Sequence, residues 1–314
     1  AALGCPHLGV RPLEERVPAA IENTAAGQIF SRLVRMTDGP SHQPLRSAVE
    51  TALDSLDPEL IVKICREAVR LLLPIESSAI EQYLFDVPVY AIGRLLGIPD
   101  TVLPHTANLM RRFVRCFSPL STTEQITQGI ATAQPLLEIV KSGLAGPLYT
   151  ALENAMREAG CDLERDLPAN AIGLIFQSYE GTAGLIGNAI KRMPTHSGSI
   201  RALLLESLQL DSAVQNTRRF AHKASSIGEN SLESGDRVLV VLAAANLDAQ
   251  TPDFSFGFGA HSCPGRELAL TIAEIGLSEL VAAGFDFTSI RFSGEYRPSA
   301  NTRIPIFEST GGHA

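Results

Sequence analysis

The sequence predicts a mainly helical fold with a small β-sheet. Apolar residues recur at helical spacing through the first two thirds of the chain, whereas strand-like segments are few and short. Residues 237–242 are rich in β-branched side chains and follow a turn sequence at 234–236, and 285–287 and 303–307 are shorter extended candidates. No internal repeat, low-complexity tract or long Pro/Gly/Ser linker divides the chain. We therefore expect residues 1–314 to form a single domain.

The predicted helices end at Pro, Gly or polar stretches. Between Pro58 and Pro74, apolar residues recur close to every 3.6 positions, which predicts an amphipathic helix over 58–73. The longest candidate is 169–193, which lies between two prolines and would be about 37 Å long. Similar but shorter patterns predict helices over 87–99, 102–117, 124–142 and 147–159.

Composition and charge exclude several classes of function. The chain has 26 Lys and Arg against 34 Asp and Glu, and its net charge of −8 argues against a nucleic-acid surface or a polybasic membrane patch. No apolar run of about 18 residues is present, and the start lacks the layout of a signal peptide. We expect a cytoplasmic protein without a membrane anchor. Five scattered cysteines without Cys-x-x-Cys spacing argue against a disulfide framework or a zinc knuckle.

One cysteine lies in a loop suited to a flat cofactor. Residues 254–265 read FSFGFGAHSCPG and lead into a predicted helix that starts at residue 266 and ends before Gly284, so Cys263 lies just ahead of a helix N-terminus. Unpaired N–H groups and the helix dipole favour a thiolate there. Three glycines let the loop backbone adopt positive φ and approach a ligand closely. They are Gly257, Gly259 and Gly265. A sulfur ligand to a heme iron has these requirements.

The pattern from Phe256 to Ala269, FG-x-G-x-H-x-C-x-G-x-x-LA, resembles the heme-thiolate signature of the cytochrome P-450 superfamily in its soluble bacterial form. The resemblance implies a helical heme domain and a cofactor, heme b (iron protoporphyrin IX). In that family Cys263 would be the iron ligand. His261 would contact a heme propionate, and Phe256 would shield the sulfur.

Other interpretations of the loop fit less well. A buried structural cysteine leaves the matched neighbours unexplained. A dinucleotide site fails because Ser262 occupies the sixth position of the Gly-x-Gly-x-x-Gly frame. A zinc site lacks two ligands, and a hydrolase with Cys263 activated by His261 lacks a third orienting group.

Two upstream segments match positions that bind heme propionates in the family. His42 and Arg46 are four residues apart and so lie on one face of a predicted helix. The family uses this spacing to hold propionates, and Arg218 in NTRRFA matches a further propionate-binding arginine. Arg219 is expected at the surface. Each guanidinium can bind a carboxylate through two hydrogen bonds.

The long central helix resembles the oxygen-activation helix of the family. The family has an acidic residue followed directly by an alcohol residue, ordinarily Thr, at this point of the helix. In QSYEGTAGLIGN, Glu180 matches the acidic residue, Gly181 stands in place of the alcohol residue, and Thr182 follows one residue later. Glu180 and Thr182 are therefore the candidate catalytic residues, although Glu180 also fits an ion pair between helices. The glycines of this helix each cost about 1 kcal/mol relative to Ala, which predicts close approach by a ligand or another segment.

Several departures indicate a shortened and divergent member. Glu206 matches the family's Glu-x-x-Arg motif, but Gln209 stands at the Arg position. Five residues separate Asp248 from Phe254, where the family has a longer meander before the cysteine loop, and the family's N-terminal sheet is reduced.

The resemblance implies monooxygenation of a small organic substrate with dioxygen and external electron donors, such as a ferredoxin with its reductase. Gly181 supports an alternative, namely a peroxide-dependent or non-monooxygenase heme-thiolate catalyst of coupling, dehydration or rearrangement. The substitution at Gln209 keeps open a third hypothesis, a non-catalytic heme-binding partner in a biosynthetic pathway.

Overall fold

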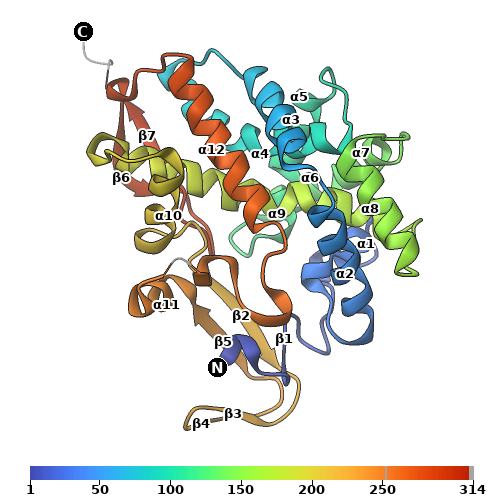
Figure 1. Cartoon of the computed structure of the whole chain (residues 1–314). Coiled ribbons are helices and arrows are strands. Elements are labelled where there is room, and N and C mark those ends of the chain that lie inside the picture. Colours follow the sequence, from blue (N-terminus) through green and yellow to red (C-terminus); the bar gives the residue numbers. More distant parts are fainter. Residues whose placement is uncertain (252, 311–314) are drawn as a thin grey trace.

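The computed structural model describes residues 1–251 and 253–310. The last four residues of the predicted 1–314 domain fall outside this part. The fold is mainly helical with small sheets, as the sequence predicts, and α9 (Asp166–Arg192) runs through the middle of the helices (Figure 1). The other helices are α1 (Ala25–Arg32), α2 (His42–Asp54), α3 (Pro58–Arg70), α4 (Ile80–Leu96), α5 (Leu103–Phe113), α6 (Thr123–Ala131), α7 (Ala133–Val140), α8 (Pro147–Glu158), α10 (Ile200–Leu210), α11 (Leu242–Ala249) and α12 (Arg266–Ala282).

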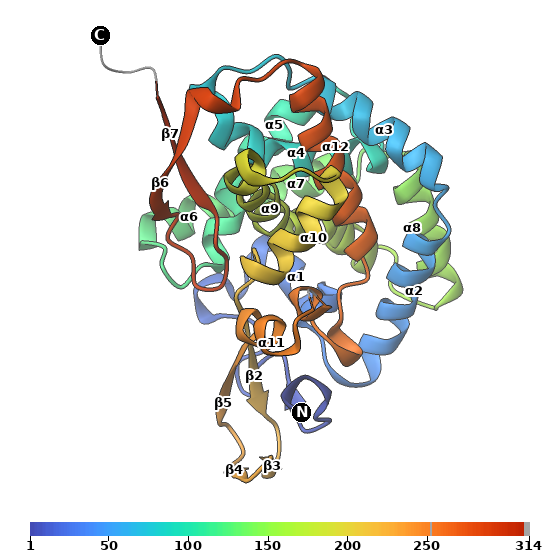
Figure 2. The ribbon, with the colours of Figure 1, turned by 60° about the vertical axis from the view of Figure 1, so that its left-hand side comes forward.

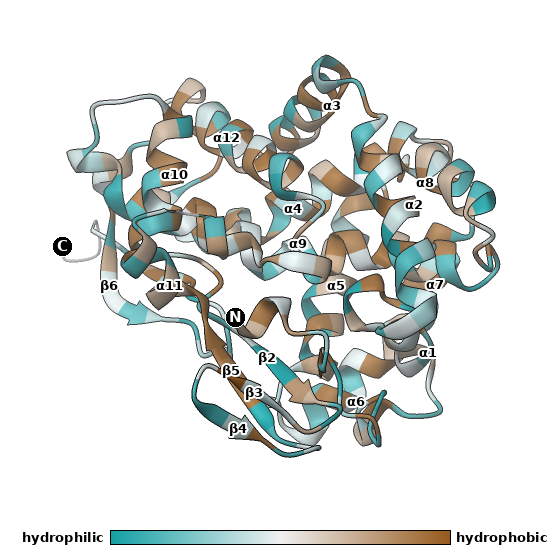
Figure 3. Ribbon diagram, turned by 60° about the horizontal axis from the view of Figure 1, so that its bottom comes forward, coloured by the Kyte–Doolittle hydropathy of each residue, from teal (hydrophilic) through white to brown (hydrophobic). Residues whose placement is uncertain are grey.

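The strands form three small antiparallel sheets. β1 (Leu8–Gly9), β2 (Asn216–Ala221) and β5 (Arg237–Val241) form one sheet in the order β1-β2-β5. The hairpin of β3 (Ser225–Ile227) and β4 (Asn230–Leu232) projects from the helical body, and β6 (Ile290–Tyr296) pairs with β7 (Pro305–Ser309) along another side (Figure 2). Strand β5 is almost wholly apolar (Figure 3), and Leu239 and Val241 on its outer face are exposed.

Three predicted elements differ from the structure. The helix predicted over 124–142 is two helices, α6 and α7, because the chain turns at Thr132, whose hydroxyl donates to the carbonyl of Gly129. Helix α4 begins seven residues before the predicted start and contains Pro88 within it. The strand predicted at 285–287 is wrong, since the Asp286 carboxylate caps a 3-10 turn there and the strand begins only at residue 290.

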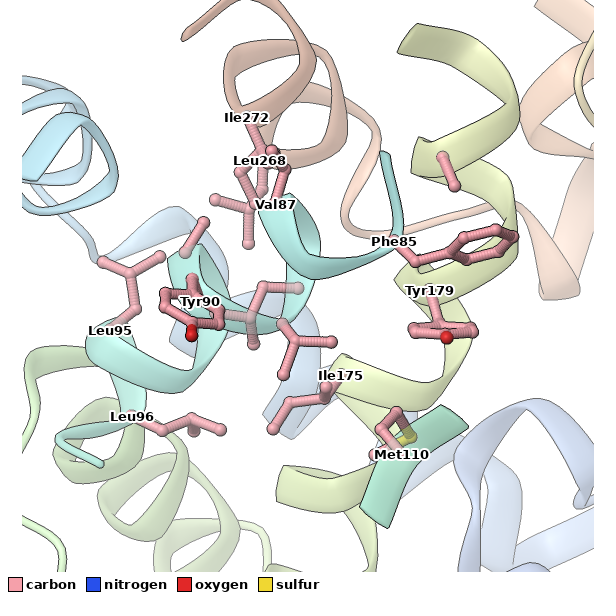
Figure 4. Packing of buried hydrophobic residues seen from close by; sticks show 14 of the residues in the cluster. Phe85, Val87, Tyr90, Leu95, Leu96, Met110, Ile175, Tyr179, Leu268 and Ile272 are labelled. Carbon is pink, nitrogen blue, oxygen red and sulfur yellow. The ribbon is translucent and has the colours of Figure 1, made fainter. Parts of the chain in front are cut away.

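The core lies where α4, α9 and α12 pack together. Figure 4 shows Phe85 of α4 against Tyr179 of α9, with ring centroids 4.9 Å apart. The hydroxyl of the fully buried Tyr83 donates to the carbonyl of Gly276 in α12 at 2.7 Å, which satisfies its polar end. Burial of each large apolar side chain contributes about 1.5–3 kcal/mol. This packing fixes the position of α9, on which the predicted catalytic residues lie.

The glycines of α9 are explained by close packing, with one exception. A Cβ at Gly173 would come within 2.6 Å of Leu33, one at Gly187 within 2.8 Å of Pro305, and one at Gly184 within 2.9 Å of Ala213. At Gly181 the nearest heavy atom would be Val214 Cγ2 at 3.9 Å. Close approach of other segments therefore accounts for three of these glycines, whereas a Cβ at position 181 would make only an ordinary van der Waals contact.

Among the described residues, no helix is long and apolar enough to cross a bilayer.

Candidate functional site

The cysteine loop is closed by its own backbone hydrogen bonds. The N–H of Cys263 donates to the carbonyl of Phe256 at 2.7 Å, and Gly257 and Gly259 both adopt φ of +72°, which only glycine adopts readily. Gly265 has an ordinary φ of −93°, but a Cβ there would meet no heavy atom within 4 Å. The first two glycines thus shape the loop as predicted, and the third leaves space beside the sulfur.

Cys263 has accessible surface, yet protein atoms surround it densely. Burial is the largest influence on its pKa and raises it, against a hydrogen bond from the Gly265 backbone and the charges of Arg35, Arg46 and Arg266. The expectation that the helix N-terminus alone favours the thiolate is therefore too simple. A thiol in this setting is deprotonated when it coordinates a metal ion. Cys263 therefore combines accessible surface with dense protein surroundings.

The first turns of α2 lie against this loop. The ring of His42 stacks on that of His261 with centroids 4.3 Å apart. The guanidinium of Arg46 donates to both the backbone carbonyl and the hydroxyl of Ser262, and it pairs with Glu50 at 2.6 Å. Two residues predicted from a distant segment are therefore beside the cysteine loop, and Arg46 braces the residue that precedes Cys263.

Asp38 was not among the predicted site residues, but it belongs to this group. Its carboxylate accepts a hydrogen bond from His261 Nε2 at 3.2 Å and another from the Val10 amide at 2.9 Å. Burial would raise the Asp38 pKa, yet these hydrogen bonds hold it below its usual value. Asp38 therefore fixes the orientation of His261. An acidic residue four positions before His42 was the available signal.

The expectation that Arg219 lies at the surface is wrong. Arg218 is exposed, whereas Arg219 is 5% exposed and points inward. Asp38 and Arg35 both influence the pKa of Arg219, so its guanidinium lies on the same side as the propionate-binding candidates. Neighbouring strand residues face opposite sides, and the pair Arg-Arg does not itself show which one faces inward.

Across from the loop, Glu180 lies on α9. Its Oε2 accepts a hydrogen bond from the Thr302 hydroxyl at 3.2 Å, and no described residue forms an ion pair with it. The described residues therefore do not show the ion pair between helices that was the other interpretation of Glu180. Beside it, Gly181 leaves a space in which an added Cβ would make only an ordinary contact.

Thr182 does not line this space, contrary to expectation. Its side chain is 2% exposed, and its hydroxyl is enclosed without a hydrogen-bond partner in the described part of the chain. Residues two apart on a helix point about 200° apart, so Thr182 and Glu180 cannot share one face.

Arg35 was not among the predicted site residues, although it lies between the two sides. It is part of a 3-10 turn, Val34–Met36, that connects α1 with α2. Burial lowers its pKa most strongly, and both Cys263 and Glu180 raise it. Arg35 therefore lies near enough to both Cys263 and Glu180 for their charges to influence its pKa.

These residues fit a heme. A sulfur donor with accessible surface lies inside the fold, and no protein atom occupies the position of a Cβ at Gly265. Cationic and imidazole groups suited to two carboxylates gather on one side of the sulfur. They are Arg46, Arg219, His42 and His261.

The chain departs from the family pattern at Gln209 and in the short segment before the cysteine loop, and other contacts replace those that the family pattern would supply. Glu206 pairs with Arg192 and with His196 at 3.3 Å, in place of an Arg at position 209. The short link from α11 to the loop is held by the buried Asn246, which donates to Ser255 Oγ at 2.7 Å and accepts from the Phe254 amide at 2.9 Å. Other contacts thus anchor the short connection before the loop.

The comparisons with known proteins agree with this geometry. No protein-family model matches the chain. It is 26% identical over 279 residues to cytochrome P-450 107B1 of Saccharopolyspora erythraea, covering 78% of this chain and 68% of the relative. It is 22% identical over 305 residues to the biotin biosynthesis cytochrome P-450 of Bacillus subtilis, covering 86% and 77%.

Solved structures show the same fold. A P-450 named BioI, in complex with hexadec-9Z-enoic acid ligated acyl carrier protein, superposes with a TM-score of 0.78 over 98% of this chain and 88% of that one, at 19% identity. Substrate-free CYP109E1 from Bacillus megaterium gives a TM-score of 0.76 over 99% and 90%, at 18% identity. These matches and the shared fold support a divergent bacterial member of the cytochrome P-450 family. Heme-thiolate oxidoreductase activity is the general activity of P-450 proteins, and their fold implies a heme cofactor.

Proposed function

We propose that this P-450 is a monooxygenase of a small organic substrate that uses dioxygen and electrons from a separate donor, such as a ferredoxin with its reductase. The observation that supports this most directly is the accessible thiol of Cys263, which, like Glu180 of α9, lies near enough to Arg35 to influence the pKa of that arginine. A single sulfur ligand on one side and a carboxylate on the other is the arrangement that this chemistry needs.

Within this proposal, Cys263 holds the iron of heme b and the whole chain acts as one heme domain. The bound heme supplies the redox chemistry that activates dioxygen. The loop itself keeps the sulfur in place, because the Cys263 N–H is bound to the Phe256 carbonyl and Arg46 is bound to Ser262. Gly265 leaves room for the macrocycle beside the sulfur.

The propionates would be held by the cationic group on one side of the sulfur. Arg219 replaces Arg218 in this proposal, because it is the arginine that points inward. His261 is oriented by Asp38, and His42 stacks on His261. Each guanidinium can bind a carboxylate through two parallel hydrogen bonds, which would also fix the orientation of the ring.

Glu180 is the group proposed to deliver protons. Its carboxylate is steadied by the Thr302 hydroxyl, and the space beside Gly181 can hold an ordered water between Glu180 and the reacting centre. A positioned carboxylate of this kind typically accelerates proton transfer by about 10²–10⁴-fold. Thr182 is not part of this route, because its hydroxyl is enclosed.

One observation favours a second function. Position 181 has no side chain, and no hydroxyl of residues 180–182 faces the space beside Glu180. A catalyst that takes hydrogen peroxide needs less proton delivery, so a peroxide-dependent or other non-monooxygenase reaction is the alternative. Turnover with peroxide and without reductase would favour it, whereas turnover that requires NAD(P)H and a redox chain would favour the monooxygenase.

The decisive experiment is the absorption spectrum of the reduced, carbon monoxide-bound protein. We expect a strongly red-shifted Soret band that disappears in Cys263→Ala. Cys5→Ala is the matched control, since Cys5 is also a partly accessible free cysteine but lies outside the loop. An ordinary heme band, or no heme binding, in the wild-type protein would overturn the proposal.

A further inference from the structure

The connection between β6 and β7 brings two hydroxyl groups toward Glu180. The Thr302 hydroxyl donates to Glu180 Oε2 at 3.2 Å, although the two residues are 122 positions apart in the chain. On the other side of Thr302, the hydroxyl oxygens of Ser299 and Thr302 are 2.6 Å apart. Ser299, Thr302 and Glu180 therefore form a continuous chain of hydrogen bonds that begins in the connection and ends on α9.

The number of available protons gives this chain a direction. A hydroxyl has one proton, and an ionised carboxylate can only accept. When Thr302 donates its proton to Glu180, the Ser299 hydroxyl must be the donor at the 2.6 Å contact. Ser299 Oγ itself accepts from the Thr302 amide at 3.2 Å. Both hydroxyl protons then point along the chain toward Glu180.

The outer end of the chain of hydrogen bonds is open to water. Ser299 is partly exposed, and its neighbour Pro298 is exposed. Water at Ser299 Oγ can therefore exchange protons with this hydroxyl, while the inner end of the chain is a carboxylate. The arrangement connects solvent with Glu180 through two side chains that are neutral and do not lose their protons on their own.

Backbone hydrogen bonds hold Thr302 in position. The Gln215 amide donates to the Asn301 carbonyl at 2.8 Å, and the Arg303 amide donates to the Ala213 carbonyl at 2.8 Å. Both neighbours of Thr302 are thus fixed to the segment that precedes β2. The Thr302 hydroxyl is therefore placed by the fold, which lowers the entropic cost of holding it against Glu180.

Two buried asparagines hold α9 on either side of Glu180. Asn188 donates to the Arg303 carbonyl at 3.3 Å, which ties α9 directly to the connection. Asn170 accepts a hydrogen bond from the Val34 amide at 3.0 Å, in the turn that follows α1. Both ends of the chain of hydrogen bonds are therefore fixed relative to each other.

We propose that Ser299 and Thr302 carry protons from solvent to Glu180, in place of the hydroxyl that position 181 lacks. This rests on the proposed function, in which Glu180 delivers protons. The Thr302 proton passes to the Glu180 carboxylate, the Ser299 proton passes to Thr302, and a proton from solvent restores Ser299. Both hydroxyls end as they began. They act through Glu180 and are positioning residues for it.

The first test compares Thr302→Val with Thr302→Ser in the full-length, heme-loaded protein. Thr302→Val removes the hydroxyl, so oxygen-dependent turnover should fall by about tenfold or more while the dissociation constant of the substrate changes by less than about twofold. Thr302→Ser keeps the hydroxyl and should keep most of the rate. Ser299→Ala should slow turnover as well, whereas the matched change Ser309→Ala, at the exposed end of β7, should not.

A double variant shows whether Thr302 acts through Glu180. In the Glu180→Gln background, Thr302→Val should cause no further loss of rate, because the proton path already lacks its end. Heme content and circular dichroism confirm folding of each variant, and Thr302→Ala replaces Thr302→Val if the latter does not fold.

A second readout does not depend on turnover. Glutamate labelled with carbon-13 at the side-chain carboxyl is followed by NMR in the reduced, carbon monoxide-bound protein, which is diamagnetic. The Glu180 signal is the one that Glu180→Gln removes. It should move in Thr302→Val, because its hydrogen bond is lost, and stay near its wild-type position in Thr302→Ser.

Three results would overturn the proposal. Thr302→Val could turn over as wild type does, or it could slow the Glu180→Gln protein as much as it slows wild type. Loss of rate in Thr302→Val but not in Ser299→Ala would mean that Thr302 only holds Glu180 in place. Failure of the proposed function is read separately, from an ordinary carbon monoxide spectrum or from unchanged turnover in Glu180→Gln alone.

Discussion

The two sides of the proposed heme site are built differently. On the Cys263 side, side chains from α2, the turn at Asp38 and the loop itself bind one another, and the backbone conformation is set by local glycines. On the α9 side, Glu180 receives one hydrogen bond from a residue of the β6–β7 connection, and the next position has no side chain. We therefore expect that cofactor binding and proton delivery can each be removed from this chain without the other.

The largest expected effect is on the α9 side. Glu180→Gln removes the proposed proton donor, so oxygen-dependent turnover should fall by roughly a hundredfold while the dissociation constant of the substrate changes little. The measurement is steady-state turnover with a redox chain beside a spectral binding titration. Thr182→Val is the matched control, because the enclosed Thr182 hydroxyl should contribute nothing to the rate. Equal rates for Glu180→Gln and wild type would remove Glu180 from the proposal.

The next effect tests the opposite side. Arg219→Leu should weaken heme binding by about tenfold to a hundredfold, since a charge-assisted hydrogen bond to a propionate contributes about 1.5–3 kcal/mol. Arg218→Leu, one residue away on the exposed face of β2, should bind heme as wild type does. Titration of heme into the two apoproteins measures the difference, and the reverse order of affinities would restore Arg218 as the propionate ligand.

Substitution of two glycines of α9 by alanine should change the stability of the fold in opposite directions. A Cβ at Gly184 would lie 2.9 Å from both Ala213 Cβ and the Arg303 carbonyl, so Gly184→Ala should destabilise the fold by about 1–3 kcal/mol. Gly181→Ala adds a methyl group that meets only Val214 at an ordinary contact distance of 3.9 Å, and it should stabilise the helix by up to about 1 kcal/mol. Urea denaturation of the apoproteins compares them. Similar losses in both variants would show that Gly181 is also closely packed.

A smaller gain is expected from Gly181→Thr, which places a hydroxyl beside Glu180. The fraction of consumed NAD(P)H that appears as product should rise, by about tenfold at most, because proton delivery improves. Gly181→Val has nearly the same shape without the hydroxyl and should give no gain. If Thr and Val behave alike, the peroxide-dependent alternative becomes the better description.

The smallest effect is a pH dependence on the Cys263 side. Burial, followed by His261 and Arg46, lowers the pKa of His42 from 6.5, so the unfolded chain takes up this proton at a higher pH than the folded chain. Stability is therefore lost as pH falls below 6.5. The lowered Asp38 pKa acts in a separate range, since its contribution is lost only as pH falls below 3.8. Urea midpoints between pH 7 and pH 5 should fall less in His42→Gln than in wild type. An equal fall would contradict the assignment.

Features encoded by short sequence patterns were predictable. The order of the helices follows from apolar spacing and prolines, and the cysteine loop follows from its glycines, His261 and Cys263. These features depend on neighbouring residues, and the structure places both His42 and Arg46 beside the loop as expected.

Features that depend on which side of an element faces inward were not predictable. The pair Arg218 and Arg219 could not be distinguished until β2 was placed between β1 and β5. Thr182 differs from Gly181 by one step of a helix, and the packing around α9 decides which of the two faces the space. Arg35 lies in a short turn without any motif, and it could be found only from its surroundings.

The Asn170 side chain has a practical consequence for enzyme engineering. One amide holds the backbone of the Val34–Met36 turn through contacts with residues 32 and 34, so the path of this turn does not depend on the side chain at position 35. A mutant library can therefore vary position 35 while these two hydrogen bonds, which involve only the backbone of residues 32 and 34, are kept. Position 170 should be left unvaried in such a library.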